Sequence, residues 1–130
     1  MKLARHLYKY ICIIFIVSFL SACASPTNDV TIPLGDKKPT LLVFCNHSDV
    51  SCLELGQITP HFDELFGEGT VSIGYIFIDS EMGLKIFDAL DLPSIPSYVF
   101  FNSEEEEVFR LVGNIDLGQL SEKVSDAIQN

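Results

Sequence analysis

The feature that most constrains the fold is an alternation of short apolar runs with segments of helical character. Four apolar runs have the length and composition of buried strands. They are residues 40–45, 71–78, 98–101 and 108–112. Helices are expected between and after them, over 52–66, 80–90 and about 117–128. Strands that alternate with helices pair in parallel through crossovers. The sequence therefore predicts one α/β domain, with the order β-α-β-α-β-β-α around a central mixed sheet.

The helix boundaries follow from local signals. Ser51-x-x-Glu54 has the form of a capping box, which predicts a helix that starts at Cys52 and bends near Pro60. Ser80 is the expected N-cap of the second helix. Its apolar face is expected to hold Leu84, Phe87 and Leu90. Glu104–Glu107 is expected to be a solvated hairpin turn.

The first 22 residues have the parts of a secretory signal peptide. Lys2, Arg5 and Lys9 form a basic head, residues 11–20 are almost wholly apolar, and small residues follow. The apolar run is too short to span a bilayer, which needs about 20 residues. The segment therefore predicts export.

Leu20-Ser21-Ala22-Cys23 resembles the lipobox of bacterial lipoproteins. The resemblance implies a diacylglyceryl thioether on Cys23, acyl chains such as palmitate, and cleavage before that residue. Residues 23–38 are then a lipidated N-terminus and a flexible tether of about 20 Å, and residues 39–130 form the domain. In enteric-type bacteria, Ala24 implies the outer membrane and the periplasm; in a Gram-positive cell, the anchor would be the outer face of the plasma membrane.

The mature chain is strongly acidic. It contains all 18 Asp and Glu but only five of the eight Lys and Arg, a formal charge of −13. Binding phosphates needs positive charge, so no nucleic acid is expected as a partner. The same charge opposes lying flat on anionic lipid.

Cleavage and lipidation leave two cysteines for chemistry, Cys45 and Cys52. Outside the cytoplasm, thiols this close in sequence are expected to be oxidised where geometry allows. The pair has the spacing Cys-x6-Cys.

Residues 37–130 resemble a shortened thioredoxin fold at four places. Lys38–Phe44 resembles the strand before the active site, and Pro60–Leu65 resembles the helix after it. Ser94-Ile95-Pro96 resembles the loop with a cis-proline. Val112-Gly113 and Gly118-Gln119-Leu120 resemble the last strand and the last helix. The resemblance implies no cofactor, and a protein substrate or partner held at Ile95 and Pro96.

Counting from Pro60 locates the attacking cysteine of the family at Cys52, eight residues earlier, with three extra residues in the preceding loop. The rival placement puts Asp49 first and Cys52 second, which inserts three residues into the helix and rotates its apolar face. A loop absorbs such an insertion more easily. The chain departs from the family in lacking Cys-x-x-Cys and any Trp, and in having Val43 where the family has a buried acid.

Three functions follow from the two cysteines. In the first, Cys52 attacks a substrate disulfide and Cys45 resolves it, as in an atypical thiol–disulfide oxidoreductase. In the second, Cys45 and Cys52 form a structural disulfide in a redox-inactive binding or adaptor module. In the third and least favoured, Cys45, His47 and Cys52, with His61, bind Cu(I) or Zn.

Overall fold

The computed structural model describes residues 30–49 and 56–130. The predicted signal peptide, Cys23, Cys52 and the predicted capping box lie outside these residues. No helix within the described ranges is long and apolar enough to cross a membrane.

The described chain has the predicted order of strands and helices. Its strands are β1 (Thr40–Cys45), β2 (Ser72–Phe77), β3 (Ser97–Phe101) and β4 (Glu107–Val112). Its helices are α3 (Ile58–Phe66), α4 (Glu81–Ala89) and α5 (Leu117–Gln129).

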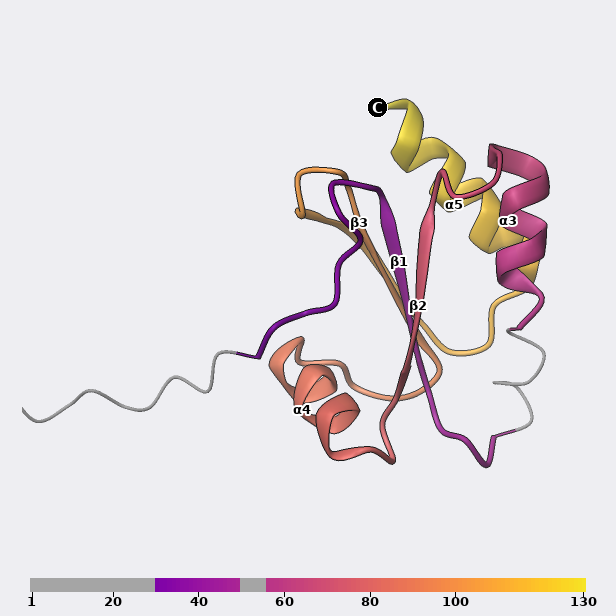
Figure 1. Cartoon of the computed structure of the whole chain (residues 1–130). Helices are drawn as coiled ribbons and strands as arrows, with labels where there is room; N and C mark the ends of the chain where they lie inside the picture. Colours follow the sequence, from indigo (N-terminus) through magenta and orange to yellow (C-terminus); the bar gives the residue numbers. More distant parts are fainter. Residues whose placement is uncertain (1–29, 50–55) are drawn as a thin grey trace, which may run out of the picture.

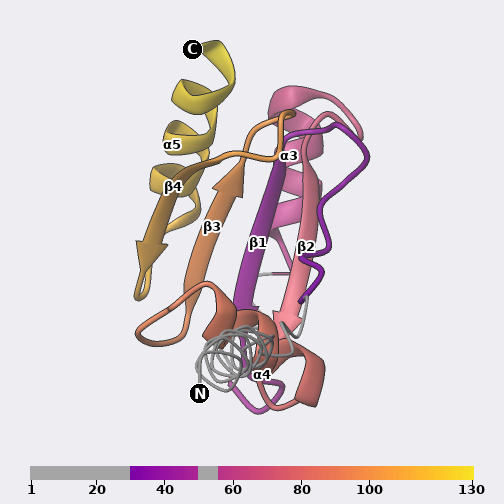
Figure 2. The same cartoon turned by 90° about the vertical axis from the view of Figure 1, so that its left-hand side faces the viewer.

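The four strands form one mixed sheet in the order β2-β1-β3-β4 (Figure 2). β1 pairs in parallel with β2, antiparallel with β3, and β3 pairs antiparallel with β4. Helices α3 and α5 cover one face of the sheet, and α4 covers the other (Figure 1). The predicted mixed-sheet α/β domain is confirmed.

Alternation along β1 divides the core into two layers, because successive side chains point to opposite faces of a strand. Leu41 and Val43 pack on the α3–α5 side with Phe62, Tyr98 and other residues. Leu42 and Phe44 pack on the α4 side. β1 is buried along its whole length, which explains why its sequence is continuously apolar.

Part of the segment expected to be a tether packs on the domain. Val30, Ile32 and Leu34 lie against the α4-side layer, while Thr31 and Pro33 between them are exposed. This period of two is that of an extended chain with one face buried. The apolar packing of the domain therefore includes residues before position 39.

Helix α3 corrects the predicted first helix. Gly56 and Gln57 form a turn, and α3 begins at Ile58, not at Cys52. Pro60 is therefore in the first turn of α3. Backbone N–H groups of the first turn have no carbonyl acceptor within the helix, so the missing N–H of Pro60 breaks no hydrogen bond. The expected bend at Pro60 is not required.

Helix α4 confirms its predicted cap and corrects its predicted face. The Ser80 side chain accepts from the Gly83 N–H at 3.0 Å. Gly83 and Ile86 are buried, and Phe87 and Leu90 pack beside them. Leu84, expected on the buried face, is 46% exposed.

Helix α5 and the hairpin behave largely as predicted. Asp116 caps α5 by accepting from the Gln119 N–H at 2.9 Å, and Leu120 and Val124 are buried on its inner face. Between β3 and β4, the Asn102 side chain accepts from the N–H groups of Glu104 and Glu106. The acidic turn is exposed, as expected.

Candidate functional site

The carboxyl ends of the parallel strands β1 and β2 meet at one edge of the sheet. The start of β3 lies at the same edge, because β3 is antiparallel to β1 and Ser97 pairs with Phe44. In open α/β sheets, the crevice outside the carboxyl ends of the strands is the usual place for a binding site. Cys45, Asp79 and the Ile95–Pro96 loop all come from this edge.

Cys45 is the last residue of β1 and is disulfide-bonded. It is the one cysteine among residues 30–49 and 56–130, so its partner lies outside them. The residue is 1% exposed. Its register partner is Phe77, and its carbonyl accepts from the Ile78 N–H at 2.9 Å. The sulfur therefore starts from a strand end that is paired with β2, and the bridge to Cys52 stays a prediction.

The loop before β3 has the conformation that the resemblance implied, with a cis Ile95–Pro96 peptide bond. The Ser97 hydroxyl donates to the Ser94 carbonyl at 2.5 Å, which closes the loop onto the strand. Pro96 is buried, and its carbonyl accepts from the Gly113 N–H at 2.8 Å. Ile95 is half-buried. Within the described ranges, its backbone N–H and C=O form no hydrogen bond.

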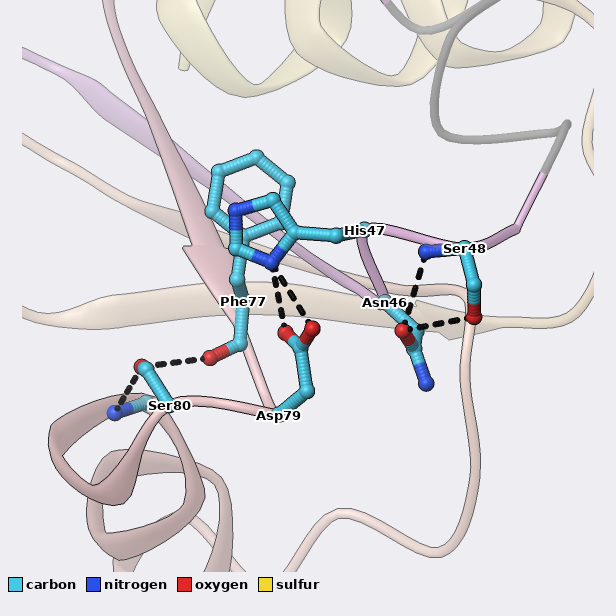
Figure 3. A network of polar contacts seen from close by, with 7 residues as sticks. Asn46, His47, Ser48, Phe77, Asp79 and Ser80 are labelled. Atoms are coloured by element: carbon cyan, nitrogen blue, oxygen red, sulfur yellow. Dashed lines mark hydrogen bonds and ion pairs between the residues drawn. The ribbon is translucent and has the colours of Figure 1, made fainter.

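A histidine and an aspartate meet at this edge from positions 32 residues apart (Figure 3). His47 lies in the turn after β1, and its Nδ1 is 2.7 and 2.9 Å from the two carboxylate oxygens of Asp79. Its ring also stacks on Phe77, with ring centroids 3.7 Å apart. The hydrogen bond from His47 lowers the pKa of Asp79 below its ordinary value of 3.8.

The turns around this pair are held by short polar contacts. The Asn46 side chain accepts from the N–H and the hydroxyl of Ser48. The Ser80 hydroxyl donates to the Phe77 carbonyl at 2.7 Å (Figure 3). Both partners of the His47–Asp79 contact therefore sit in turns with defined geometry.

His61, named above as a possible metal ligand, makes a contact between two helices. It is half-buried on α3, and its Nε2 is 3.1 Å from the Ser121 hydroxyl on α5. His47 is used in the contact with Asp79. Among the described residues, no three His, Cys, Asp or Glu side chains converge as a metal site would require. The predicted Cu(I) or Zn set includes Cys52, which lies outside these residues, so that alternative stays a prediction.

Val43, where the thioredoxin family has a buried acid, also has apolar surroundings in the structure. Val43 is fully buried in β1, beside Tyr98 of β3 in the pairing register. Burial raises the pKa of the Tyr98 phenol, which keeps that group neutral. Neither side chain is suited to accept a proton at neutral pH.

A groove of about 630 Å³ lies at the opposite end of the sheet. It is bordered by Pro39, the turn at Asn102–Glu104 and the end of α5. None of the predicted site residues lines it. The candidate site is therefore separate from this groove.

Comparison with known proteins supports the fold through structure alone. No protein-family model matches the chain, and no curated protein matches its sequence. Among solved structures, oxidised thioredoxin O2 from Arabidopsis thaliana matches with a TM-score of 0.59 and 16% identity, over 69% of this chain and 75% of that one. The fold is thioredoxin-like.

A second thioredoxin-like neighbour gives the same result. The germline-specific thioredoxin Deadhead from Drosophila melanogaster matches with a TM-score of 0.60 and 16% identity, over 72% of this chain and 84% of that chain. At 16% identity, these two TM-scores show a shared fold and nothing about function. The chemistry of this thioredoxin-like domain has to be argued from its own residues.

The His47–Asp79 contact was missed at the level of sequence. Asp79 was not singled out as a site residue in the sequence, and His47 was considered only as a metal ligand. One signal was present, because each residue follows the end of one of two neighbouring parallel strands. Strand ends of that kind lie side by side, so polar residues just beyond them are candidates for contact.

Proposed function

We propose that this protein is a membrane-tethered, extracytoplasmic lipoprotein that exchanges thiols and disulfides through Cys52 and Cys45. The observation that carries the proposal is the disulfide-bonded Cys45 at the carboxyl end of β1. The Ile95–Pro96 loop belongs to the same sheet edge. Lipid on Cys23 would keep the domain at a bacterial membrane, facing the periplasm or the cell exterior.

In this mechanism, the Cys52 thiolate attacks one sulfur of a substrate disulfide, and the other substrate sulfur leaves as thiolate. The Cys45 thiolate then attacks Cys52 in the mixed disulfide, which releases the second substrate thiol and closes Cys45–Cys52. The substrate gains two electrons, and the protein loses them. An oxidised protein that meets a dithiol runs the same steps in reverse.

Substrate binding is assigned to the backbone of Ile95. Proline has no N–H, and the Pro96 carbonyl already accepts from Gly113. The N–H and C=O of Ile95 are both available within the described ranges. An extended substrate segment that adds to this backbone would lie next to the end of β1.

The test is an insulin-reduction assay on the mature protein with dithiothreitol as electron donor, together with its reduction potential. The wild type is expected to turn over, and its potential is expected above about −300 mV, outside the range of structural disulfides. Cys52→Ser should abolish turnover, while Cys45→Ser should form mixed disulfides that do not resolve. A wild type without turnover, or with a potential well below −300 mV, would contradict exchange chemistry.

The burial of Cys45 favours a second candidate function. At 1% exposure, this sulfur has the environment of a structural disulfide. A bridge that closes a loop of about eight residues would stabilise the fold by about 2.5 kcal/mol in the chain-entropy model. The domain would then present the Pro96 face to a partner protein, and Cys45→Ala with Cys52→Ala would lower stability but leave partner binding intact.

A further inference from the structure

Strand β4 is an open edge of the sheet. It is the outermost strand beside α5 (Figure 2), and within the described ranges it pairs with β3 alone. In an antiparallel pair, successive residues direct their N–H and C=O groups alternately toward the neighbouring strand and away from it. The Gly113 N–H donates to the Pro96 carbonyl at 2.8 Å, which fixes this alternation. Val112 and Arg110 therefore direct their N–H and C=O groups outward.

The outward groups of β4 find no partner in the rest of the described chain. Among residues 30–49 and 56–130, no backbone hydrogen bond beyond those within the sheet uses the N–H or C=O of Arg110 or Val112. The opposite edge differs, because Gly35 lies against Ser72 at the start of β2. An exposed row of N–H and C=O groups is a template for another extended chain. The edge of β4 is therefore the candidate position for an added strand.

A groove follows this edge between β4 and α5. One part is the groove of about 630 Å³ at the end of the sheet away from Cys45, where Val108 and Phe109 of β4 border it. A second part, of about 370 Å³, is bordered by Leu111 of the same strand. Lys123 and Asp126 of α5 border both parts, so the two adjoin. This β4–α5 groove has an apolar floor supplied by β4 and a polar wall supplied by α5.

The charged groups that border the β4–α5 groove are mostly acidic. They are the carboxylates of Glu104, Glu122 and Asp126 and a single ammonium group, that of Lys123. Within the part of the chain that the structure describes, none of these three carboxylates forms an ion pair. The whole chain has a formal charge of −10, so a second copy would be repelled from this edge. A cationic segment is complementary to it.

We propose that the edge of β4 binds an extended, cationic segment of a partner protein, which adds to the sheet as a further strand. The main chain of the segment pairs with the outward groups of Arg110 and Val112. Side chains alternate along a strand, so every second one faces the β4–α5 groove. A Lys or Arg at such a position covers Phe109 and Leu111 with its stem, and its charged head reaches the carboxylates on α5.

This docking edge goes beyond the proposed exchange chemistry and does not depend on it. Neither Cys45 nor the Ile95–Pro96 loop borders the groove. A partner bound along β4 would therefore leave the candidate site at the carboxyl ends of β1 and β2 uncovered.

The probe is a fluorescein-labelled peptide with blocked ends, Thr-Arg-Thr-Val-Thr-Arg-Thr, in which arginine and valine occupy one face of an extended chain. The control peptide, Thr-Glu-Thr-Val-Thr-Glu-Thr, reverses its charge. Fluorescence anisotropy measures binding to the mature protein, and NMR measures hydrogen exchange at each backbone amide.

Two variants separate the backbone contribution from the charge contribution. Val112→Pro removes an outward N–H and no hydrogen bond to β3, and Val112→Thr is its control. Glu122→Gln with Asp126→Asn removes two carboxylates from the groove. Its control is Glu64→Gln with Asp88→Asn, which removes two exposed carboxylates from α3 and α4.

The arginine peptide is expected to bind the wild type, and the glutamate peptide is not. At saturation, exchange at the Arg110 and Val112 amides should slow by about tenfold or more, whereas exchange at Leu111, which faces β3, should change little. Val112→Pro should weaken binding about tenfold, and the double variant without the α5 carboxylates about fivefold. Both control variants should bind like the wild type, and added salt should weaken binding.

Equal anisotropy for the two peptides would overturn the proposal, because the charge of the groove would then select nothing. Binding that leaves exchange at Arg110 and Val112 unchanged, or a peptide that becomes helical when bound, would overturn strand addition. Slow exchange at these two amides that grows with protein concentration, without peptide, would assign the edge to a second copy instead. Circular dichroism checks that each variant is folded, and the charge variant tests the proposal even if Val112→Pro does not fold.

Discussion

At the scale of single residues, the central strand β1 is apolar along its interior, and polar groups follow the ends of β1 and β2. Val43 and Tyr98 leave the middle of the sheet without an ionised group, whereas His47 and Asp79 meet just beyond the strands. The ionisable groups described at this edge therefore belong to residues in turns. Such residues are solvent-accessible, so their titration can be measured directly.

The Asp79 carboxyl should titrate below pH 3.8 in the folded protein, because His47 donates a hydrogen bond to its ionised form. A group whose pKa is lower in the folded state stabilises that state above the unfolded-state pKa, and this stabilisation is lost as pH falls through the folded value. NMR titration of the Asp79 side-chain carbon should show this. In His47→Gln, the Asp79 pKa should rise toward 3.8. An unchanged Asp79 pKa in that variant would contradict the contact.

At the scale of elements, most of the fold could be predicted from local patterns. Continuous apolar runs located the strands, and Ser80 located the start of α4. Local patterns did not give the face of α4, because Met82 and Leu84 extend the apolar surface on both sides of Ile86 and Phe87. What selects the face is the close approach of Gly83 to β2, a tertiary contact.

Gly83→Ala should destabilise the domain although alanine is the better helix former by about 1 kcal/mol. A Cβ at position 83 would lie 1.9 Å from the Phe77 carbonyl oxygen and 2.8 Å from the Ser80 hydroxyl. Overpacking of this kind costs about 1–3 kcal/mol, and here the obstacle is backbone. Urea denaturation should show a lower midpoint. Gly118→Ala, whose nearest contact is the Asp116 carboxylate at 3.1 Å, should have a smaller effect, and a stabilised Gly83→Ala would be inconsistent with the packing of α4 on β2.

The start of α3 and the packing of residues 30–34 could not be predicted for a related reason. Pro60 was interpreted as interior only because the helix was expected to begin at Cys52. Val30, Ile32 and Leu34 have the alternation of an extended chain, but this segment is not part of the four-stranded sheet that the structure describes. The alternation alone therefore did not indicate what the segment packs against. In both cases, the deciding information is where a segment lies against the rest of the domain.

Ile32→Ser should lower the free energy of unfolding by about 1 kcal/mol, because roughly half of a full isoleucine burial is lost. For a domain of this size, thermal unfolding should then begin about 4–8 °C lower. Thr31→Ser changes an exposed neighbour and serves as the control. Equal melting temperatures for the two variants would mean that residues 30–34 contribute nothing to stability.

At the scale of the whole molecule, the packing of Val30 shortens the reach of the proposed anchor. Only residues 24–29 then separate Cys23 from the packed chain. A flexible chain of six residues has a root-mean-square span of about 13 Å. The domain would therefore work close to the membrane surface, on substrates that approach that surface.

Cys23→Ala should move the protein from the detergent phase to the aqueous phase in detergent phase partitioning, because the modified sulfur would be missing. Its unfolding free energy should equal that of the wild type, since the substitution changes none of the core residues that the structure describes. Mass spectrometry of the wild type should show the mass of the lipid on Cys23. A wild type that partitions into water, or that retains residues 1–22, would contradict the lipoprotein assignment.

If Cys45 belongs to an exchangeable disulfide with Cys52, a redox titration of the mature protein in glutathione buffers will show it directly, with the bridge mapped by peptide mass spectrometry. We expect a bridge between residues 45 and 52 and a reduction potential between about −300 and −120 mV, the range of exchanging disulfides. A bridge from Cys45 to another cysteine, or a disulfide that stays oxidised well below −300 mV, would contradict it.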